Sequence, residues 1–389
     1  MTRLVRHSRG GAGQGRRGLT MVELVLAAGL GVLVMTGVFS LLTTSLDLWT
    51  KGESRRNQVE RSGAVLQLLA KDLRGASGGS RGDFLVDWKP FDVDGDRSPD
   101  RVWPRMRFVR QGSEAELARL YLESLPPADA ERLREEGFLP AKNEGGLQHD
   151  PPPPTGLVEV CWAVLPAGPK EAIYEGVLMR GLRYVDESLG SFMDSGFFDS
   201  AGKPPTGTLD EVTGGVLWFQ PLMATGSSQV GAGWIPGTGL ADVATAWDAR
   251  NADRPDADQH AFNELPRSQQ GPGLAGARSI HLPRSVRLEL EFESERERRR
   301  RPLLAENIEA SDVRIEVTNG ADLPREEGAH IMIGGEWMVV VALDGDRINV
   351  QRGARATLPA SHAQGARLHY GRSVVTEVSL PMYQQQWNR

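Results

Sequence analysis

The longest apolar segment of the chain runs from Leu24 to Leu46 and contains no charged residue. As an α-helix it would span roughly 35 Å at ~1.5 Å per residue, and the hydrocarbon core of a bilayer is about 30 Å thick. Residues 1–18 carry five arginines and no acid, which is typical of the cytoplasmic flank of an inserted segment. The pattern predicts a transmembrane helix over about 24–46, with Glu23 at its edge.

The pattern beyond this segment is that of an amphipathic helix. Val59, Leu66, Leu69 and Leu73 recur near helical spacing with charged residues between them, and a cluster of glycines then ends the pattern. One helix is therefore expected from about Leu19 to about Arg74, apolar in its first half and amphipathic in its second.

Two ordinary explanations of the apolar segment leave Glu23 without a role. A removed signal peptide needs a shorter apolar core followed by a small-x-small cleavage site, and the sequence TTSLDLWTKGES offers no convincing site. A simple single-pass anchor, with Glu23 as its first interfacial residue, is the other alternative. It places a carboxylate beside hydrocarbon, where a charge at mid-depth costs on the order of 2.5–3.5 kcal/mol.

The rest of the chain shows the alternation of β-strands. Segments 157–165, 215–223 and 285–293 predict strands by their apolar alternation and their β-branched or aromatic content. In the third segment, one face is apolar (Val286, Leu288, Leu290, Phe292) and the other is charged (Arg287, Glu289, Glu291, Glu293). This pattern predicts a half-buried antiparallel strand whose apolar face packs on the amphipathic half of the helix, so the expected fold class is α+β.

Two stretches are expected to be insertions into this β body, which would cover residues 76–293. The first lies at about 110–155; Ser113 and Glu116 stand at the spacing of a capping box and predict a short helix over 113–125. A run of four prolines near its end predicts a stiff linker.

The second insertion covers 226–276 and is rich in Gly, Asp and Pro, which predicts a long surface loop. Trp234 and Trp247 either pin this loop to the body or form a contact surface. The pinned arrangement is the one that we expect.

Residues 302–372 predict a small β module of their own. Short apolar strands alternate with Asn-Gly, Gly-Gly and Asp-Gly pairs, which signal hairpin turns. Residues 373–389 would then return to the body, where Val374–Leu380 pairs with the strand 285–293. Such an insertion at a hairpin tip is tolerated, because loop-closure entropy grows slowly with length.

The connection into this module reads SERERRRRP. A polybasic patch for a membrane or a partner is one interpretation, but the arginines are interleaved with Glu293, Glu295 and Glu297. We therefore expect a solvated linker.

Composition narrows the possible functions. The formal net charge of −6 argues against a nucleic-acid partner, and the single Cys161 excludes an internal disulfide framework. Enzyme motifs lack their context, since GASGG at 75–79 follows a helix rather than a strand. The seven histidines form no His-x-x-x-His pair, and His362 and His369 are expected in turns or strands of the β module rather than on zinc. We expect no enzyme.

One loop has the spacing of metal ligands. The stretch DVDGDRSPD offers four carboxylates that suit calcium: Asp92, Asp94, Asp96 and Asp100. Arg97 stands where an EF-hand has its glycine, and Trp103 replaces the closing glutamate. The alternatives are a calcium site and an acidic turn before the strand 101–109.

The residues around the start of the apolar segment resemble a known processing site. Gly18-Leu19-Thr20-Met21-Val22-Glu23-Leu24, preceded by a basic leader, resembles the N-terminal motif of type IV prepilins and of type II secretion pseudopilins. The resemblance implies that a prepilin peptidase removes residues 1–18 by cutting after Gly18, and that the new amino group of Leu19 is methylated. It also implies that Glu23 is an assembly contact, paired with the Leu19 ammonium of a neighbouring subunit. Leu19 replaces the phenylalanine that is commonest there.

Three further segments resemble the J-type minor pseudopilin: LQLLAKDLRGA, GVLMRGLRYVDE and LPRSVRLELEFE. This resemblance implies a structural subunit that initiates or caps the pseudopilus during filament assembly for protein transport. Its implied place is the bacterial inner membrane, with the body in the periplasm. Its implied partners are other minor and major pseudopilins, the peptidase and inner-membrane lipid, and the implied domains are a helix over 19–75 and the β body. A W-type minor pilin of a type IV pilus, with an assembly or adhesion role, is the alternative.

Overall fold

The computed structural model of the chain describes residues 20–77, 84–91, 101–124, 127–135, 156–168, 174–185, 191–194, 196–199, 202–224, 243–249, 276–278, 282–326, 328–355 and 357–381. These residues belong to two units that divide between Asn57 and Gln58. The first unit is a length of helix and the second is a β-rich body with a helical segment of its own. The chain is therefore α+β.

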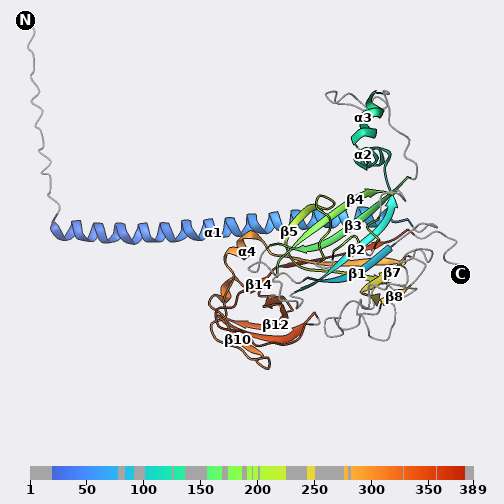
Figure 1. Cartoon of the computed structure of the whole chain (residues 1–389). Helices are drawn as coiled ribbons and strands as arrows, with labels where there is room; N and C mark the ends of the chain where they lie inside the picture. The colour runs from blue at the N-terminus through green and yellow to red at the C-terminus, as the bar shows by residue number, and fades with distance from the viewer. Residues whose placement is uncertain are drawn as a thin grey trace, which may run out of the picture. The chain divides into compact units, whose positions relative to one another are not determined.

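One helix, α1 (Met21–Arg74), accounts for the first unit and continues into the second (Figure 1). In the first unit its apolar side chains are exposed, from Met21 through Phe39 to Trp49. Among the described residues, α1 alone is long and apolar enough to cross a membrane. The helix predicted from about Leu19 to Arg74 is confirmed over the described residues.

The second unit is built on a large sheet of ten strands. Its strands are β1 (Phe84–Phe91), β2 (Arg101–Gln111), β3 (Leu157–Pro166), β4 (Gly176–Tyr184), β5 (Asp210–Ala224), β6 (Val243–Ala244), β7 (Ala246–Asp248), β8 (Gly276–Arg278), β9 (Ser285–Phe292) and β15 (Arg372–Ser379). They follow the order β15-β9-β5-β4-β3-β2-β1-β7-β8, with β6 beside β5. Neighbouring strands are antiparallel except for β7 and β8.

The predicted strands and their pairing are confirmed. The segments 157–165, 215–223 and 285–293 lie in β3, β5 and β9. The returning strand β15 pairs with β9 over eight residues, from Arg372 opposite Phe292 to Ser379 opposite Ser285. The chain leaves the large sheet after β9, forms the β module, and comes back beside the strand that it left.

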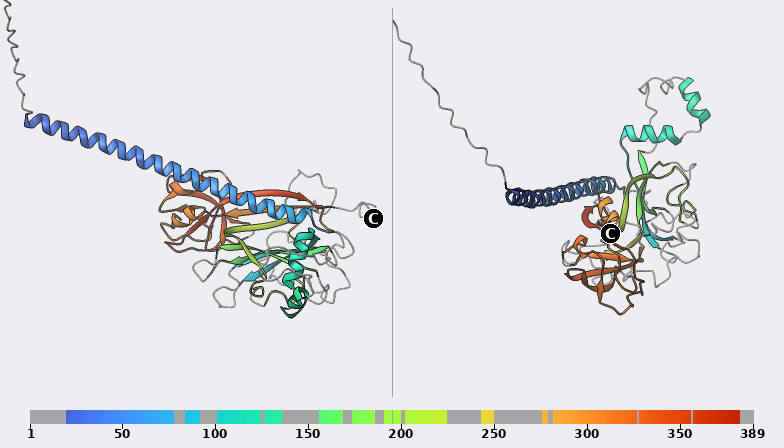
Figure 2. Two further views of the ribbon diagram at one scale, coloured as in Figure 1. Left: turned by 90° about the horizontal axis from the view of Figure 1, so that it is seen from above. Right: turned by 90° about the vertical axis from the view of Figure 1, so that its left-hand side faces the viewer.

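The core lies between this sheet and the C-terminal turns of α1, which run along one face of the sheet (Figure 2). Val65, Leu69 and Leu73 pack in one cluster with the apolar face of β9, as predicted. Val59, by contrast, is 44% exposed, so the buried stripe of α1 starts later than its pattern indicated. Trp247 is buried in the same cluster, which confirms that it pins its segment, whereas Trp234 lies outside the described residues.

The insertion near 110–155 contains two short helices, α2 (Glu114–Ser124) and α3 (Pro127–Glu135). Ser113 caps the first by accepting a hydrogen bond from the Glu116 N–H at 3.3 Å. The Glu116 carboxylate in turn accepts a hydrogen bond from the Ser113 backbone N–H, which completes the predicted capping box. The same carboxylate accepts hydrogen bonds from Arg110 of β2 at 2.6 and 2.8 Å, which fastens α2 to the sheet.

The β module forms a second sheet with its own core. Its five strands, in the order β10-β13-β12-β11-β14, are β10 (Arg314–Glu316), β11 (His330–Ile333), β12 (Glu336–Asp344), β13 (Arg347–Ala354) and β14 (Leu368–Tyr370). Gly334 and Gly335 both have positive φ in the turn between β11 and β12, as the Gly-Gly pair predicted. The Asn-Gly pair does not make a hairpin. It leads into the 3₁₀ turn η2 (Gly320–Asp322), where a Cβ on Gly320 would lie 2.1 Å from the carbonyl oxygen of Gly345.

The linker expected after β9 is solvated in part, since no residue of its middle, Glu295–Arg299, is buried, but it is helical and its ends are buried. Ser294 caps a short helix, α4 (Glu295–Arg299), with a complete capping box formed with Glu297. The following Arg301 has a side chain that is only 5% exposed. The charged face of β9 is also not solvated at its end, because Glu291 and Glu293 are buried. The second sheet covers these carboxylates, which a strand pattern alone cannot show.

Candidate functional site

Glu23 closes the N-terminus of α1. Its carboxylate accepts hydrogen bonds from the Thr20 N–H at 2.9 Å and from the Thr20 hydroxyl at 3.0 Å. The Thr20 hydroxyl oxygen in turn accepts a hydrogen bond from the Glu23 N–H at 3.2 Å. This reciprocal pair is a capping box, which satisfies donors that the first turn of a helix leaves free. Glu23 therefore has a local partner within its own chain.

The side chains that follow Glu23 present apolar surface on all sides of the helix. Leu33 is 71% exposed, Phe39 is 63% exposed and Trp49 is 66% exposed. A soluble protein rarely exposes so continuous an apolar surface, and such a surface marks contact with lipid or with other chains. Gly18 and Leu19, the predicted processing site, lie outside the described residues, as do Asp92, Asp94, Asp96 and Asp100 of the predicted calcium loop.

At the other end of α1, Asp72 fastens the helix to the sheet. Its side chain is fully buried and accepts hydrogen bonds from Trp162 Nε1 at 3.0 Å and from Arg180 Nε and Nη2, each at 2.8 Å. Arg110 Nε lies 3.1 Å from the same carboxylate. These partners come from β3, β4 and β2, so one carboxylate connects the helix to three strands.

Asp72 is not among the site residues predicted from the sequence, although its position indicates a buried carboxylate. Asp72 stands seven residues after Val65 and beside Leu73, which places it on the apolar stripe of the amphipathic half. An acid at such a position must be neutralised in the core. The pattern indicates that a partner exists, but it does not identify the partner.

A second charged centre lies where the two sheets meet. We call it the inter-sheet junction. Its residues are charged or aromatic side chains and the two groups that contact Arg101: Arg101, Trp103, Glu175, Leu217, Trp218, Glu291, Glu293, Arg301, Met332, Trp337, Arg355 and His369. The guanidinium carbon of Arg355 lies 4.1 Å from the ring centroid of Trp337 and 4.8 Å from that of Trp218. Arg355 also pairs with Glu291 at 2.7 Å. The junction thus joins the module to the body through aromatic faces and buried charge.

Arg101 of β2 is buried in this junction without a carboxylate partner among the residues that the structure describes. Its Nη2 donates to the Leu217 carbonyl at 2.6 Å and its Nη1 to Met332 Sδ at 2.7 Å. The ring of Trp103 lies 4.6 Å from the guanidinium carbon. Burial, reinforced by the nearby positive charge of Arg355, lowers the pKa of Arg101 to about 9.

Three residues of the junction resemble a metal-binding group: Glu175, Glu293 and His369, whose ligand atoms lie within 4.8 Å of one another. A cation is already present, because Arg301 Nη2 contacts both carboxylates and its Nε donates to Glu293 at 2.7 Å. Arg298 adds a further contact to Glu175 at 3.0 Å. Two arginines therefore balance two glutamates, so the arrangement is an ion-pair cluster that needs no metal.

His362 and His369 lie in a β-bridge and in a strand of the module, the positions predicted for them. His362 Nε2 lies 2.9 Å from Glu336, whose carboxylate is also bound by Arg352 at 2.7 Å. Although burial opposes it, these hydrogen bonds lower the pKa of Glu336 to about 2. His369 lies on β14, where burial and neighbouring arginines lower its pKa to about 3.

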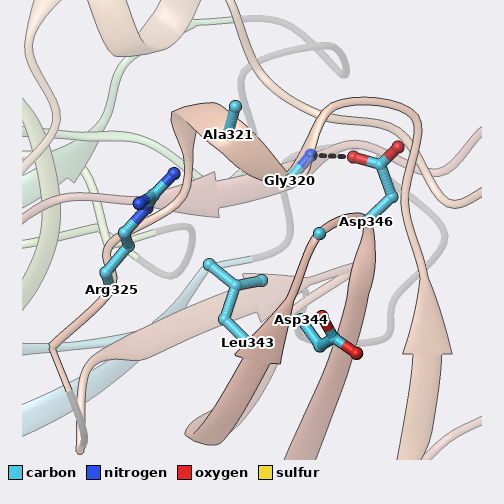
Figure 3. Close-up of a pocket in the computed structure, with 7 residues that line it drawn as sticks. Gly320, Ala321, Arg325, Leu343, Asp344 and Asp346 are labelled. Atoms are coloured by element: carbon cyan, nitrogen blue, oxygen red, sulfur yellow. Dashed lines mark hydrogen bonds between the residues drawn. The ribbon is translucent and has the colours of Figure 1, made fainter.

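One open pocket lies on the module, next to η2 and the turn between β12 and β13 (Figure 3). Its volume of about 290 Å³ is at the lower limit of small-molecule sites, which hold about 300–1,000 Å³. Arg325 and Asp344 line it, while Asp346 is engaged by the Gly320 N–H at 2.7 Å. Asp346 therefore serves the turn.

Comparison with known proteins found no family model that matches the chain and no curated protein with significant similarity. The functional interpretation therefore rests on the residues and the structure. They supply one exposed apolar helix whose first turn carries Glu23 in a capping box, and a body in which two sheets are joined through buried ion pairs.

Proposed function

We propose that the chain is a membrane-anchored, type IV pilin-like subunit of the J-type minor pseudopilin class, with a structural role in assembling a periplasmic filament for protein export. The observation that carries the proposal is the division of α1. The helix exposes apolar side chains from Met21 to Trp49, whereas from Gln58 onward it belongs to an antiparallel β body. Such a helix suits an anchor that later packs among other helices.

Glu23 is the residue through which assembly would be controlled. Cleavage after Gly18 would free an amine on Leu19, which is mostly protonated near neutral pH because its reference pKa is about 7.7–8. Inside a filament the carboxylate of one subunit would meet the ammonium group of its neighbour, and the pairing would offset the desolvation of both charges.

The capping box offers a competing explanation of Glu23, and variants separate the two. Glu23→Gln keeps a side chain that can close the box, but it removes the charge. Thr20→Ala weakens the box and keeps the charge. The proposal expects Glu23→Gln to insert into the inner membrane normally and to fail in filament incorporation, measured by cross-linking to neighbouring subunits. Thr20→Ala is expected to be incorporated.

The opposite pattern would contradict the role of charge: normal incorporation of Glu23→Gln with failure of Thr20→Ala would make Glu23 a helix cap. Mass spectrometry of the N-terminus tests processing separately. A methylated start at Leu19 is expected, and a mature chain that starts at Met1 would refute membership of the processed class.

A further inference from the structure

Sheet edges are places where a protein exposes unpaired N–H and C=O groups to another strand. The two sheets end in β8, β15, β10 and β14. Three of these edge strands have three residues each, whereas β15 has eight. Short edge strands are one way in which proteins prevent unwanted pairing. Within the described part of the chain, β15 is the exception.

The ladder that holds β15 is also regular. Its eight pairs with β9 show no register shift, whereas β4–β5, β5–β9 and β12–β13 each contain an irregularity. β15 contains no proline, and four of its central residues, Val374, Val375, Thr376 and Val378, are β-branched. Bulges, prolines and inward charges protect edges from added strands. None of these devices interrupts β15, which is drawn in red in Figure 2.

The alternation of hydrogen bonds along β9 and β15 shows which backbone N–H and C=O groups of β15 are available to a new strand. Glu293 donates its N–H to Gly215 on the β5 side, so the preceding Phe292 faces β15. At the other end of the ladder, Leu380 donates to the carbonyl of Arg284. Even-numbered residues of β15 therefore direct their backbone N–H and C=O groups toward β9. The odd-numbered residues direct theirs outward, and these are Ser373, Val375, Glu377 and Ser379.

The same alternation sorts the side chains. Val378 is buried and Val374 packs against the core, so the even-numbered face continues the apolar surface under α1. The odd-numbered side chains are exposed, and Val375 is 50% exposed. An added strand would extend both faces, one apolar and one polar.

We propose that β15 is the docking edge for an extended segment of another protein, which adds to the large sheet as a further strand. The existing partner β9 shows what such a segment contains. It places Leu288 and Leu290 opposite the inward face of β15, and it places Arg287 opposite Glu377. The incoming strand accordingly carries aliphatic residues at alternate positions and a basic residue opposite Glu377.

A second copy of the chain fits this edge less well. Antiparallel self-pairing through the outward groups would place an odd-numbered residue opposite Glu377, and the candidates are Gly371, Ser373, Val375, Glu377 and Ser379. None of them is basic, so the charge of Glu377 would have no partner. The docking edge does not depend on the proposed filament role, because it follows from the body alone.

Binding of a defined peptide to the full chain in detergent micelles tests the proposal. The probe is a fluorescently labelled peptide with the β9 sequence SVRLELEF, followed by fluorescence anisotropy. Saturable binding is expected, and Val375→Pro should weaken Kd by about tenfold or more, because it removes an outward N–H and blocks the edge. Val375→Thr, which keeps the N–H, is the matched control and should bind like the unmodified chain. Thermal melting verifies that both variants fold.

A charge exchange keeps the test decisive if Val375→Pro does not fold. Glu377→Lys should weaken binding of the probe, and a probe with glutamate in place of its arginine should restore it. Absence of binding to the unmodified chain, or equal binding to Val375→Pro, would overturn the proposal. A concentration-dependent dimer lost in Val375→Pro would assign the edge to a second copy and overturn the proposed occupant. Glu23→Gln should bind the probe normally, which separates this test from that of the filament role.

Discussion

Replacing Asp72 by alanine is expected to destabilise the body. The carboxylate is fully buried and neutralises Arg180 (18% exposed) and Arg110 (6% exposed). Alanine would remove the one carboxylate that is hydrogen-bonded to Arg180 among the described residues, leaving only the electrostatic attraction of Glu116, and it would leave Trp162 Nε1 without its acceptor. Arg110 would keep Glu116.

The magnitude follows from these contacts. Removal of one partner of a buried ion pair costs about 3–5 kcal/mol. Because Arg110 retains Glu116 and Arg180 has partial access to water, the lower end applies, about 3 kcal/mol. For a body of this size each kcal/mol lowers Tm by roughly 2 °C, so the loss is roughly 6 °C. Asp72→Asn should lose less, since its amide oxygen can still accept from Trp162.

The assay is thermal unfolding of the full chain in detergent, followed by tryptophan fluorescence and by circular dichroism. A double-mutant cycle with Arg180→Ala measures the coupling, which should exceed about 1 kcal/mol for groups in one buried network. Asp72→Leu combined with Arg180→Leu is the control, because removal of both charges should restore much of the stability. Additive single changes, or a loss below about 1 kcal/mol for Asp72→Ala, would refute the fastening role of this carboxylate.

Three further predictions concern buried groups. Arg101→Met should leave stability unchanged or raise it, because it removes a buried charge that lacks a carboxylate partner in the described structure; a loss of more than about 2 kcal/mol in chemical denaturation would contradict this. His369 binds its proton more weakly in the folded state, where its pKa is about 3, than in the unfolded chain, so stability should fall as pH drops below about 6.5. By pH 5 its contribution to that fall is about 2 kcal/mol, and His369→Phe should flatten the decline; an unchanged slope would show that other groups dominate. Burial raises the pKa of Cys161 to about 12, so a thiol reagent at pH 8 should modify it only after unfolding in guanidinium, and rapid modification of the folded chain would be inconsistent with its burial.

Local pattern was sufficient for much of the fold. Helical periodicity located α1, and the alternation of Val286 to Phe292 placed the apolar face of β9 against it. The pairing of β15 with β9 was predictable as well, because the β module reads as a unit of its own and the flanking strands must meet where it is inserted. For α1 and for the apolar face of β9, the determining pattern lies within one short segment.

The burial of the charged groups and the identity of their partners were decided by the tertiary structure. Glu291 and Glu293 occupy the polar positions of an alternating strand, and the pattern of β9 is the same whether water or a second sheet covers that face. Arg301 and Arg355, which neutralise them, come from the connection into the module and from the module itself. Likewise, Asp72 meets Arg180 across 108 positions of the chain. Periodicity reports that a side chain faces inward or outward from its own element, whereas the identity of what lies opposite depends on how distant segments pack.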